Sequence, residues 1–313
     1  MSKIAFVFPG QGAQSLGMGK ELYDNHGIVK ETFEKISDLS LIDIKKICFG
    51  DDASLLSSTE NCQMSLFALS ASCLALMDEN NVTCSAVAGF SLGECTALYA
   101  SKIVTLEDAV KLILLRGRAM KAASERSDGV MCAVLGLDAG IIDGICKSVA
   151  ETAAGFVGAV NYNSAAQTVI AGERSAVAIA SAQLTKAGAS KIVPLAVSGA
   201  FHTKLMDTAG AELESALSDF AFSPPSVPLY TNVTGNILPT GENIARHMKV
   251  QMTNAVRWQS SVENMASDGV TTFIELGAGR VLSGLIKRIS KTSVTANVED
   301  EKSLEKTLET LKS

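Results

Sequence analysis

A serine at the centre of residues 89–93, Gly-Phe-Ser-Leu-Gly, carries the strongest chemical signal in this chain. An apolar run (82–89) precedes it, and a helix-like run begins near Glu94. Gly-x-Ser-x-Gly between a strand and a helix is typical of a tight turn that exposes a nucleophilic hydroxyl. The N–H of Leu92 and the start of the helix would then face the oxyanion of an acyl transfer. The pattern favours Ser91 as a nucleophile; a glycine-rich turn with a buried serine is the alternative.

A nucleophilic serine needs a general base, and the chain has only three histidines. His202 lies in AVSGAFHTKLM, a loop of small residues between a predicted strand and a predicted helix, where catalytic groups are often carried. His26, in LYDNHGIVK, and His247, in NIARHMKVQM, are both expected on solvated surfaces. We therefore predict that His202 accepts the proton of Ser91.

An arginine lies on the apolar side of the helix predicted over 105–125. At helical spacing Arg116 shares a face with Leu112, Ile113 and Met120, whereas Arg118 lies on another face. A buried arginine must be paired with an anion, or its burial is costly. Its partner is either a protein carboxylate in a structural salt bridge or a substrate carboxylate bound by the guanidinium fork.

The glycine-rich loop after the first predicted strand, FPGQGAQSLGMG, resembles a phosphate-binding turn only superficially. Ser15 occupies the place of the third glycine in a dinucleotide-binding pattern, and the Lys-Ser/Thr pair of a P-loop is missing. A loop in this position can instead supply the second donor of an oxyanion hole. We assign that role to the backbone N–H of Gln11.

The order of predicted elements indicates an α/β protein interrupted by a small α+β unit. Residues 125–198 follow the order β-α-β-β-α-β, which is that of a ferredoxin-like unit. The expected domains are therefore an α/β catalytic body (1–124 and 199–313) and an inserted ferredoxin-like subdomain (125–198). Strands are expected at 3–8, 82–89, 129–136, 156–163, 167–173, 190–197, 228–232 and 271–277. Helices are expected at 19–37, 63–80, 105–125, 138–152, 174–188, 205–220, 258–269, 279–290 and 299–313, with one more beginning near Glu94.

Composition limits the class of protein. The 313 residues are 47% hydrophobic but only 5% aromatic, which is typical of close helix–sheet packing. The net charge of −6 disfavours nucleic acid and anionic membranes as partners. Seven cysteines without a C-x-x-C pair are expected to be reduced core thiols rather than disulfides or metal ligands. With no signal-peptide pattern and no apolar run of about 20 residues, a cytoplasmic protein is expected.

Taken together, these motifs resemble the malonyl-CoA:acyl carrier protein transacylase family along nearly the whole chain. The resemblance implies a hydrolase-like α/β body with an inserted ferredoxin-like subdomain. Its segments occur in the family's order: FPGQGAQ, NCQMSLFALS, AGFSLGE, LLRGRAM, NYNSAAQTVIAG, VSGAFHTKLM, LYTNVTG, QMTNAVRW and IELGAGRVLSGLIKR.

By position, the resemblance implies roles for eight residues. The nucleophile is Ser91, the base is His202, and the malonyl-binding residue is Arg116. The oxyanion hole falls on the N–H groups of Gln11 and Leu92. Polar residues that line the family's site match Gln63, Gln251 and Asn161, and a backbone carbonyl at Gln251 holds the histidine in place of an aspartate. Accordingly, no triad aspartate is evident: Asp138 and Asp143 fall in ordinary helix-start positions.

The chain departs from the family pattern next to the nucleophile, where Phe90 replaces the usual histidine. This substitution removes any hydrogen bond from that side chain and questions the detailed shape of the turn. Usual prolines are also replaced at Met64, Ala165 and Ala278.

The resemblance implies transfer of malonyl from malonyl-CoA to acyl carrier protein for fatty-acid synthesis, through a malonyl-Ser91 ester and without a metal or redox cofactor. A monomer is expected, with the guanidinium of Arg116 free of protein anions and one malonyl length from the hydroxyl. Four residues, Arg280, Lys287, Arg288 and Lys291, could dock the carrier, or could simply form a solvated helix face. The alternatives are a serine esterase or thioesterase, a trans-acting polyketide acyltransferase, a non-catalytic carrier-binding protein and, most distantly, a dinucleotide-dependent oxidoreductase.

Overall fold

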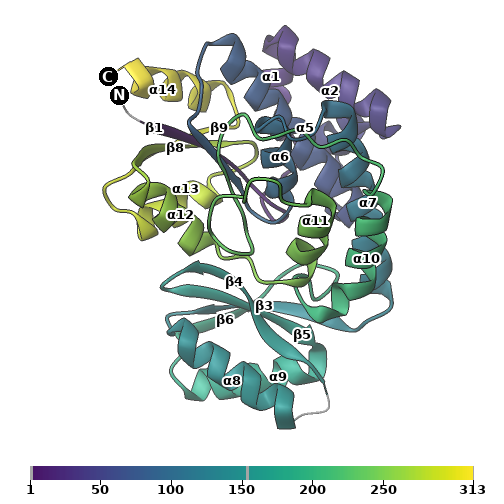
Figure 1. Cartoon of the computed structure of the whole chain (residues 1–313), viewed down its shortest axis with the longest axis vertical. Coiled ribbons are helices and arrows are strands. Elements are labelled where there is room, and N and C mark those ends of the chain that lie inside the picture. The colour runs from purple at the N-terminus through teal and green to yellow at the C-terminus, as the bar shows by residue number, and fades with distance from the viewer. Residues whose placement is uncertain (1–2, 153–154, 313) are drawn as a thin grey trace.

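The larger part of the chain is built on a five-stranded parallel sheet (Figure 1). The computed structural model describes residues 3–152 and 155–312. The strand order is β7-β2-β1-β8-β9, and every neighbouring pair is parallel. The strands are β1 (Lys3–Phe8), β2 (Ala86–Gly89), β7 (Leu229–Tyr230), β8 (Val270–Leu276) and β9 (Val294–Val298). The middle strand, β1, is the apolar segment that opens the chain.

Side chains of β1 alternate between the two faces of this sheet, and helices cover both faces. Phe6 and Phe8 enter the larger apolar cluster, whereas Ala5 and Val7 enter a second one. The second cluster is closed by α12 (Trp258–Ser267) and α13 (Val281–Ile289). The larger cluster is closed by α1 (Lys20–Asn25), α2 (Gly27–Ser40), α3 (Ile44–Phe49), α4 (Ala53–Ser57), α5 (Thr59–Glu79), α6 (Leu92–Ala100), α7 (Leu106–Glu125), α10 (Asp207–Ala216), α11 (Ile244–Thr253) and α14 (Glu301–Lys312).

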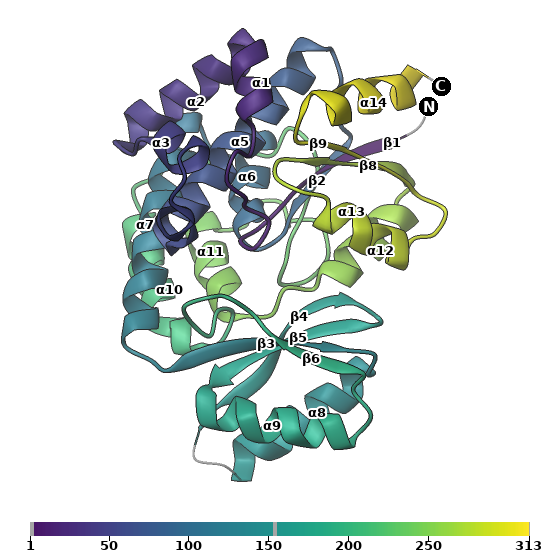
Figure 2. The same ribbon diagram turned by 180° about the vertical axis from the view of Figure 1, so that it is seen from behind.

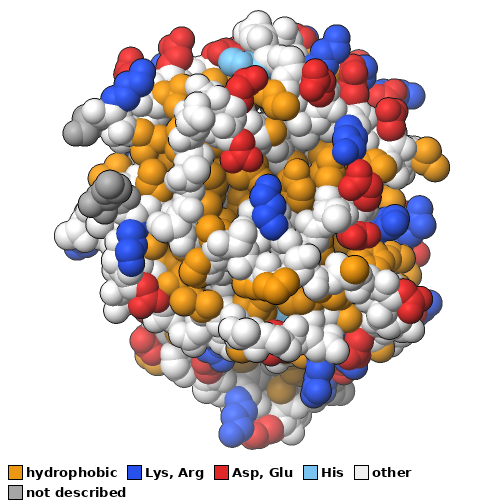
Figure 3. Space-filling model, turned by 45° about the horizontal axis from the view of Figure 1, so that its top comes forward, with side chains coloured by type: hydrophobic (Ala, Val, Ile, Leu, Met, Phe, Trp, Pro, Cys, Tyr) orange, Lys and Arg blue, Asp and Glu red, His pale blue; other side chains and the backbone are white. Residues whose placement is uncertain are grey.

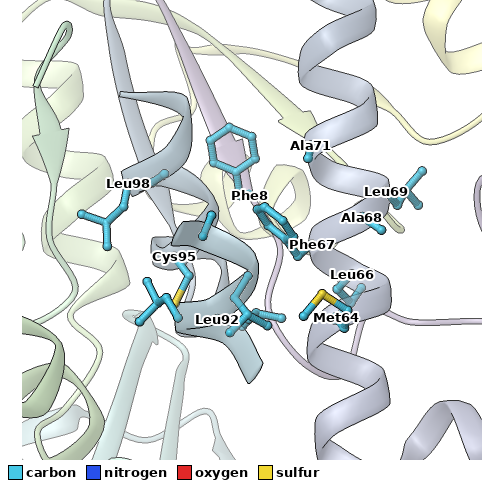
Figure 4. Packing of buried hydrophobic residues seen from close by; sticks show 14 of the residues in the cluster. Phe8, Met64, Leu66, Phe67, Ala68, Leu69, Ala71, Leu92, Cys95 and Leu98 are labelled. Atoms are coloured by element: carbon cyan, nitrogen blue, oxygen red, sulfur yellow. The ribbon is translucent and has the colours of Figure 1, made fainter. Parts of the chain in front are cut away.

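Helix α5 is buried almost all round, as expected for a helix whose apolar residues are spread over all its faces. Figure 4 shows Phe67 of α5 facing the nucleophile helix α6 and the end of β1. Phe67, Phe8 and Leu92 are each at most 1% exposed. The start of α6, where Ser91 is found, is therefore packed against rigid neighbours.

A separate four-stranded antiparallel sheet lies below the body (Figure 2). Its order is β4-β5-β3-β6, with two helices on its outer face forming a third apolar cluster. The elements are β3 (Gly129–Leu135), α8 (Ala139–Thr152), β4 (Val157–Ser164), β5 (Gln167–Glu173), α9 (Arg174–Lys186) and β6 (Lys191–Pro194). This arrangement confirms the predicted fold class, and we retain 125–198 as the proposed extent of the subdomain.

Several local predictions differ from the structure: the single helix expected at 19–37 is divided into α1 and α2, and α3 and α4 were not expected. Helix α6 begins at Leu92 rather than near Glu94, and α11 was not expected. Strand β9 was missed because it pairs only with β8 at the sheet edge, and Val298 alone of its residues is buried. All seven cysteines are free; Cys84 and Cys132 are half-buried and the other five are buried. Among the described residues, no helix is both long and apolar enough to cross a bilayer.

The packing of α6 against β1 gives a stability prediction. A Cβ on Gly93 would lie 2.0 Å from the Phe8 carbonyl oxygen, which is main chain and cannot rotate away. Gly93→Ala should therefore lower the free energy of unfolding by about 3 kcal/mol, the upper part of the range for overpacking. Gly284→Ala is the control, because a Cβ there meets no atom within 4 Å and the residue lies inside α13. Equal urea midpoints for the two variants would contradict this account.

Candidate active site

Ser91 occupies a strained turn between β2 and α6. Its φ of 53° and ψ of −105° lie outside the regions that a residue with a side chain normally adopts. The turn is possible because glycines stand on both sides: a Cβ on Gly89 would lie only 1.9 Å from the carbonyl of Gly93. The sequence pattern therefore predicts the turn correctly, and Ser91 is half-buried at the wall of a cavity.

Ser91 and His202 are hydrogen-bonded although 111 residues separate them. Ser91 Oγ lies 2.8 Å from His202 Nε2, and His202 Nδ1 lies 2.9 Å from the Gln251 carbonyl oxygen. A carbonyl can only accept, so Nδ1 carries the proton and donates it to Gln251. The lone pair of Nε2 is then free to accept the proton of the serine hydroxyl, as a general base requires.

The surroundings of His202 keep its imidazole neutral. The residue is 5% exposed. Burial, followed by the positive charge of Arg116, lowers the pKa of His202 to about 4. At neutral pH the ring is therefore uncharged and ready to accept a proton from Ser91.

Arg116 lies beneath the serine with its guanidinium fully buried. One terminal nitrogen donates to Gln63 Oε1 at 2.8 Å, and the other donates to Ser91 Oγ at 3.2 Å and to Gln251 Oε1 at 3.5 Å. Over residues 3–152 and 155–312, no carboxylate lies within 4.0 Å of this guanidinium, and its Nε has no partner. The salt-bridge alternative is therefore wrong for the described residues, and a buried cation is held by neutral oxygens alone.

The distance expected between Arg116 and Ser91 was too long. The guanidinium touches the serine oxygen instead of standing one malonyl length away. In this arrangement Ser91 Oγ accepts a hydrogen bond from Arg116 while its own proton points to His202. A positive charge at that distance also favours the developing alkoxide.

A cavity of about 230 Å³ opens between the two sheets of the molecule at these residues. It is lined by Ser91, His202 and Arg116 together with Gln11, Leu92 and Asn161. The N–H groups of Gln11 and Leu92 make no hydrogen bond to any described backbone group, so both are available to a ligand. Asn161, on β4, is 4% exposed and brings the small subdomain to the cavity wall.

Gln63 and Gln251 lie outside the cavity wall, behind the reacting groups. Both are fully buried, and both hold the guanidinium of Arg116. Gln251 also donates from its side chain to the Ser91 carbonyl oxygen at 2.7 Å. The eight residues singled out in the sequence therefore gather around one cavity.

Three further residues of the site were not found from the sequence. The side-chain oxygen of Asn232 accepts the Ser91 N–H at 2.7 Å, and the Asn232 N–H donates to the buried Glu94 carboxylate, also at 2.7 Å. Glu94 in turn contacts His247 Nε2. His247 was expected on a solvated face because Arg246 and Lys249 flank it, but it is only 8% exposed.

The other expectations about histidine and aspartate can be compared directly. His26 is half-buried, with Nε2 2.8 Å from the Glu301 carboxylate, so it is less solvated than expected. Asp138 accepts the Gly140 N–H at 2.8 Å at the start of α8, and Asp143, within α8, accepts the Tyr162 hydroxyl. Neither aspartate bonds to His202, which agrees with the failure to identify a third triad residue.

Phe90 does not disturb the turn. Its ring packs edge-on against Trp258, with centroids 5.8 Å apart. Its backbone N–H donates to the Phe8 carbonyl, and its own carbonyl accepts the Gly93 N–H, both at 2.9 Å. Main-chain bonds thus hold the turn whatever side chain stands at position 90.

Known proteins resemble this chain over its whole length. The model of the acyl transferase domain family matches residues 5–306. A malonyl CoA-acyl carrier protein transacylase of Bacillus subtilis is 36% identical over 312 residues, which are 100% of this chain and 98% of that protein. The corresponding transacylase of Escherichia coli K12 is 37% identical over 97% of each chain.

Solved structures agree with these sequence matches. A malonyl-transacylase in complex with its type II PKS acyl-carrier protein superposes with a TM-score of 0.95 at 38% identity, covering 99% of this chain and 100% of that chain. The transacylase of Streptococcus pneumoniae superposes with a TM-score of 0.93 at 39% identity, covering 98% of this chain and 100% of that chain. The chain therefore belongs to the malonyl-CoA:acyl carrier protein transacylase family, within the acyl transferase domain family.

Proposed function

We propose that this protein is an [acyl-carrier-protein] S-malonyltransferase of fatty-acid biosynthesis. It would move malonyl from malonyl-CoA to the pantetheine thiol of acyl carrier protein through an ester on Ser91. One observation carries the proposal: a buried guanidinium without a carboxylate partner among the described residues touches a serine hydroxyl that is hydrogen-bonded to a neutral imidazole. The names of the relatives, as transacylases of malonyl-CoA and acyl carrier protein, support the same activity.

The first half-reaction forms the acyl-enzyme. Ser91 Oγ attacks the thioester carbonyl carbon while His202 Nε2 takes its proton. The carbonyl oxygen becomes an oxyanion that accepts hydrogen bonds from the N–H groups of Gln11 and Leu92. The tetrahedral intermediate collapses by breaking the C–S bond, and the imidazolium returns its proton to the leaving thiolate, releasing CoA. His202 is then neutral again.

The second half-reaction uses the same groups in the opposite direction. The pantetheine thiol of the carrier gives its proton to His202 Nε2 as its sulfur attacks the ester carbonyl. The same two N–H groups would hold the oxyanion, and the C–O bond to Ser91 breaks. The serine oxygen recovers a proton from the imidazolium, so the enzyme ends unchanged and the kinetics are ping-pong.

Arg116 supplies selection for a carboxylated acyl group. Burial lowers the pKa of Arg116, yet a guanidinium stays protonated in proteins. Its cost of burial falls when a malonyl carboxylate arrives to neutralise it. Gln63 and Gln251 accept hydrogen bonds from the guanidinium and so fix its orientation. An esterase that takes neutral acyl groups has no use for this buried charge.

The partners of the reaction follow from the same proposal. Malonyl-CoA is the donor, acyl carrier protein is the acceptor, and the enzyme acts as a monomer. No metal or redox cofactor takes part, since protein groups serve each proton transfer and the oxyanion.

Arg280 directly precedes Val281, which lines the cavity, so the basic residues of α13 are suited to docking an acidic carrier. Figure 3 shows one face on which hydrophobic side chains form a central band among charged ones.

Replacing the nucleophile should abolish covalent labelling. Incubation of Ser91→Ala with malonyl-CoA is expected to leave the intact mass unchanged, because no other hydroxyl of the described residues is hydrogen-bonded to His202. Ser148→Ala, an exposed position on α8, should label like the wild type. Mass spectrometry of the intact chains makes the comparison; malonyl retained by Ser91→Ala would place the nucleophile elsewhere.

Replacing the cation should weaken the preference for malonyl-CoA over acetyl-CoA. A charge-assisted hydrogen bond contributes about 1.5–3 kcal/mol, so Arg116→Ala should reduce the ratio of the two kcat/KM values by about 10- to 100-fold. Arg118→Ala is the matched control, because its side chain is 67% exposed on the same helix. If the ratio survives in Arg116→Ala, the arginine is structural and the substrate assignment fails.

The pH dependence of kcat/KM should show that His202 is neutral at neutral pH. Protonation of His202 removes the acceptor, so kcat/KM with acetyl-CoA should fall as the pH drops through about 4. In Arg116→Gln this acidic limb should move to higher pH, because loss of the neighbouring positive charge favours the imidazolium. Arg118→Gln should leave it in place. A wild-type limb near the ordinary histidine value of about 6.5 would contradict the buried, neutral ring.

A further inference from the structure

The side chain of Asn232 holds the main chain of the turn at Ser91. Asn232 lies just after β7 and is fully buried. Its oxygen accepts the Ser91 N–H at 2.7 Å, and its amide nitrogen donates to the Gly89 carbonyl at 2.6 Å. One side chain thus bonds to main-chain groups of both Gly89 and Ser91. Without it, the strained backbone of Ser91 would lose one of its two side-chain supports, and the Ser91 N–H and the Gly89 carbonyl would lose these hydrogen bonds.

Asn232 is itself fixed by a buried carboxylate. Glu94, on the first turn of α6, is completely buried and accepts the Asn232 backbone N–H at 2.7 Å. Its other oxygen contacts His247 Nε2. Burial lowers the pKa of His247, but contact with Glu94 outweighs burial and the net shift is upward. The two oxygens of Glu94 are thus shared between a main-chain donor and an imidazole, so this buried polar group is hydrogen-bonded on both sides.

The contact between Glu94 and His247 joins the two halves of the catalytic pair. Glu94 belongs to α6, which begins directly after Ser91, whereas His247 belongs to α11. Gln251 lies four residues after His247, one helical turn along α11, and its carbonyl holds His202 Nδ1. The Gln251 side chain also reaches back to the Ser91 carbonyl at 2.7 Å. A shift of α11 relative to α6 would therefore move the imidazole away from the hydroxyl.

We propose that Asn232, Glu94 and His247 are positioning residues that lock α6 to α11 and so set the contact between Ser91 Oγ and His202 Nε2. They touch neither the cavity nor the acyl group, and they act through the backbone of Ser91 and the carbonyl of Gln251. The proposal rests on the proposed acyl transfer, because its effect is measured on that reaction. It predicts loss of rate without loss of substrate binding.

The test is single-turnover acylation by malonyl-CoA, followed by quenching and intact mass. The amplitude gives the fraction of competent enzyme, so a partly unfolded variant still yields a rate constant. His247→Leu removes the donor to Glu94, and Asn232→Ala removes both bonds to the turn. Misplacing reacting atoms by about 1 Å can cost about 100-fold. We expect acylation 10- to 100-fold slower in both variants, with the half-saturating malonyl-CoA concentration changed less than threefold.

Two further variants separate positioning from general stability. His247→Gln keeps an N–H donor at nearly the same place and should recover the acylation rate to within about threefold of wild type. Tyr230→Phe is the matched control. Tyr230 lies two residues before Asn232, and the variant removes its partly buried hydrogen bond to Asp268, which involves no atom of Ser91; it should acylate at the wild-type rate.

The outcomes distinguish the two levels of the account. If the wild type acylates and both His247→Leu and Asn232→Ala acylate within twofold of it, the positioning proposal is overturned. It is equally overturned if His247→Gln is as slow as His247→Leu, or if Tyr230→Phe slows acylation as much as Asn232→Ala. If the wild-type chain itself takes up no malonyl, the proposed function fails instead.

Discussion

The site depends on one serine oxygen held between a neutral base and a buried cation. Ser91 Oγ is hydrogen-bonded to His202 Nε2 on one side and accepts a hydrogen bond from Arg116 on another. Burial and, after it, the positive charge of Arg116 lower the pKa of the His202 imidazole, so the ring remains uncharged. The positive charge of Arg116 therefore has no carboxylate partner among the described residues until an anion enters the cavity. We propose that a substrate carboxylate supplies this negative charge.

The fold brings these groups together from distant parts of the chain. Ser91 needs the tight turn between β2 and α6, and that turn needs glycines because the main chains of β1 and α6 approach so closely. His202 needs the carbonyl of Gln251 on α11. The small antiparallel sheet supplies the opposite wall through Asn161. The cavity at the Ser91 hydroxyl is therefore enclosed by residues of both the α/β body and the antiparallel subdomain.

Much of this arrangement could be predicted from the sequence, because the decisive signals are local. Ser91 is marked by its glycines and flanking elements, and Arg116 by a charge on an apolar helical face. The network of Asn232, Glu94 and His247 could not be predicted, since each residue looks ordinary beside its own neighbours. His247 in particular is flanked by charges that point to solvent while its own ring points inward. Burial of a polar side chain is a tertiary property, and local spacing does not encode it.

The most direct measurement is a crystal structure of the chain after reaction with malonyl-CoA in the absence of a thiol acceptor. We expect an ester on Ser91, with its carboxylate on the two terminal nitrogens of Arg116 and its carbonyl oxygen facing the N–H groups of Gln11 and Leu92. A malonyl carboxylate lying in solvent, with Arg116 still bound only to Gln63 and Gln251, would contradict the account. So would an acyl group carried on any residue other than Ser91.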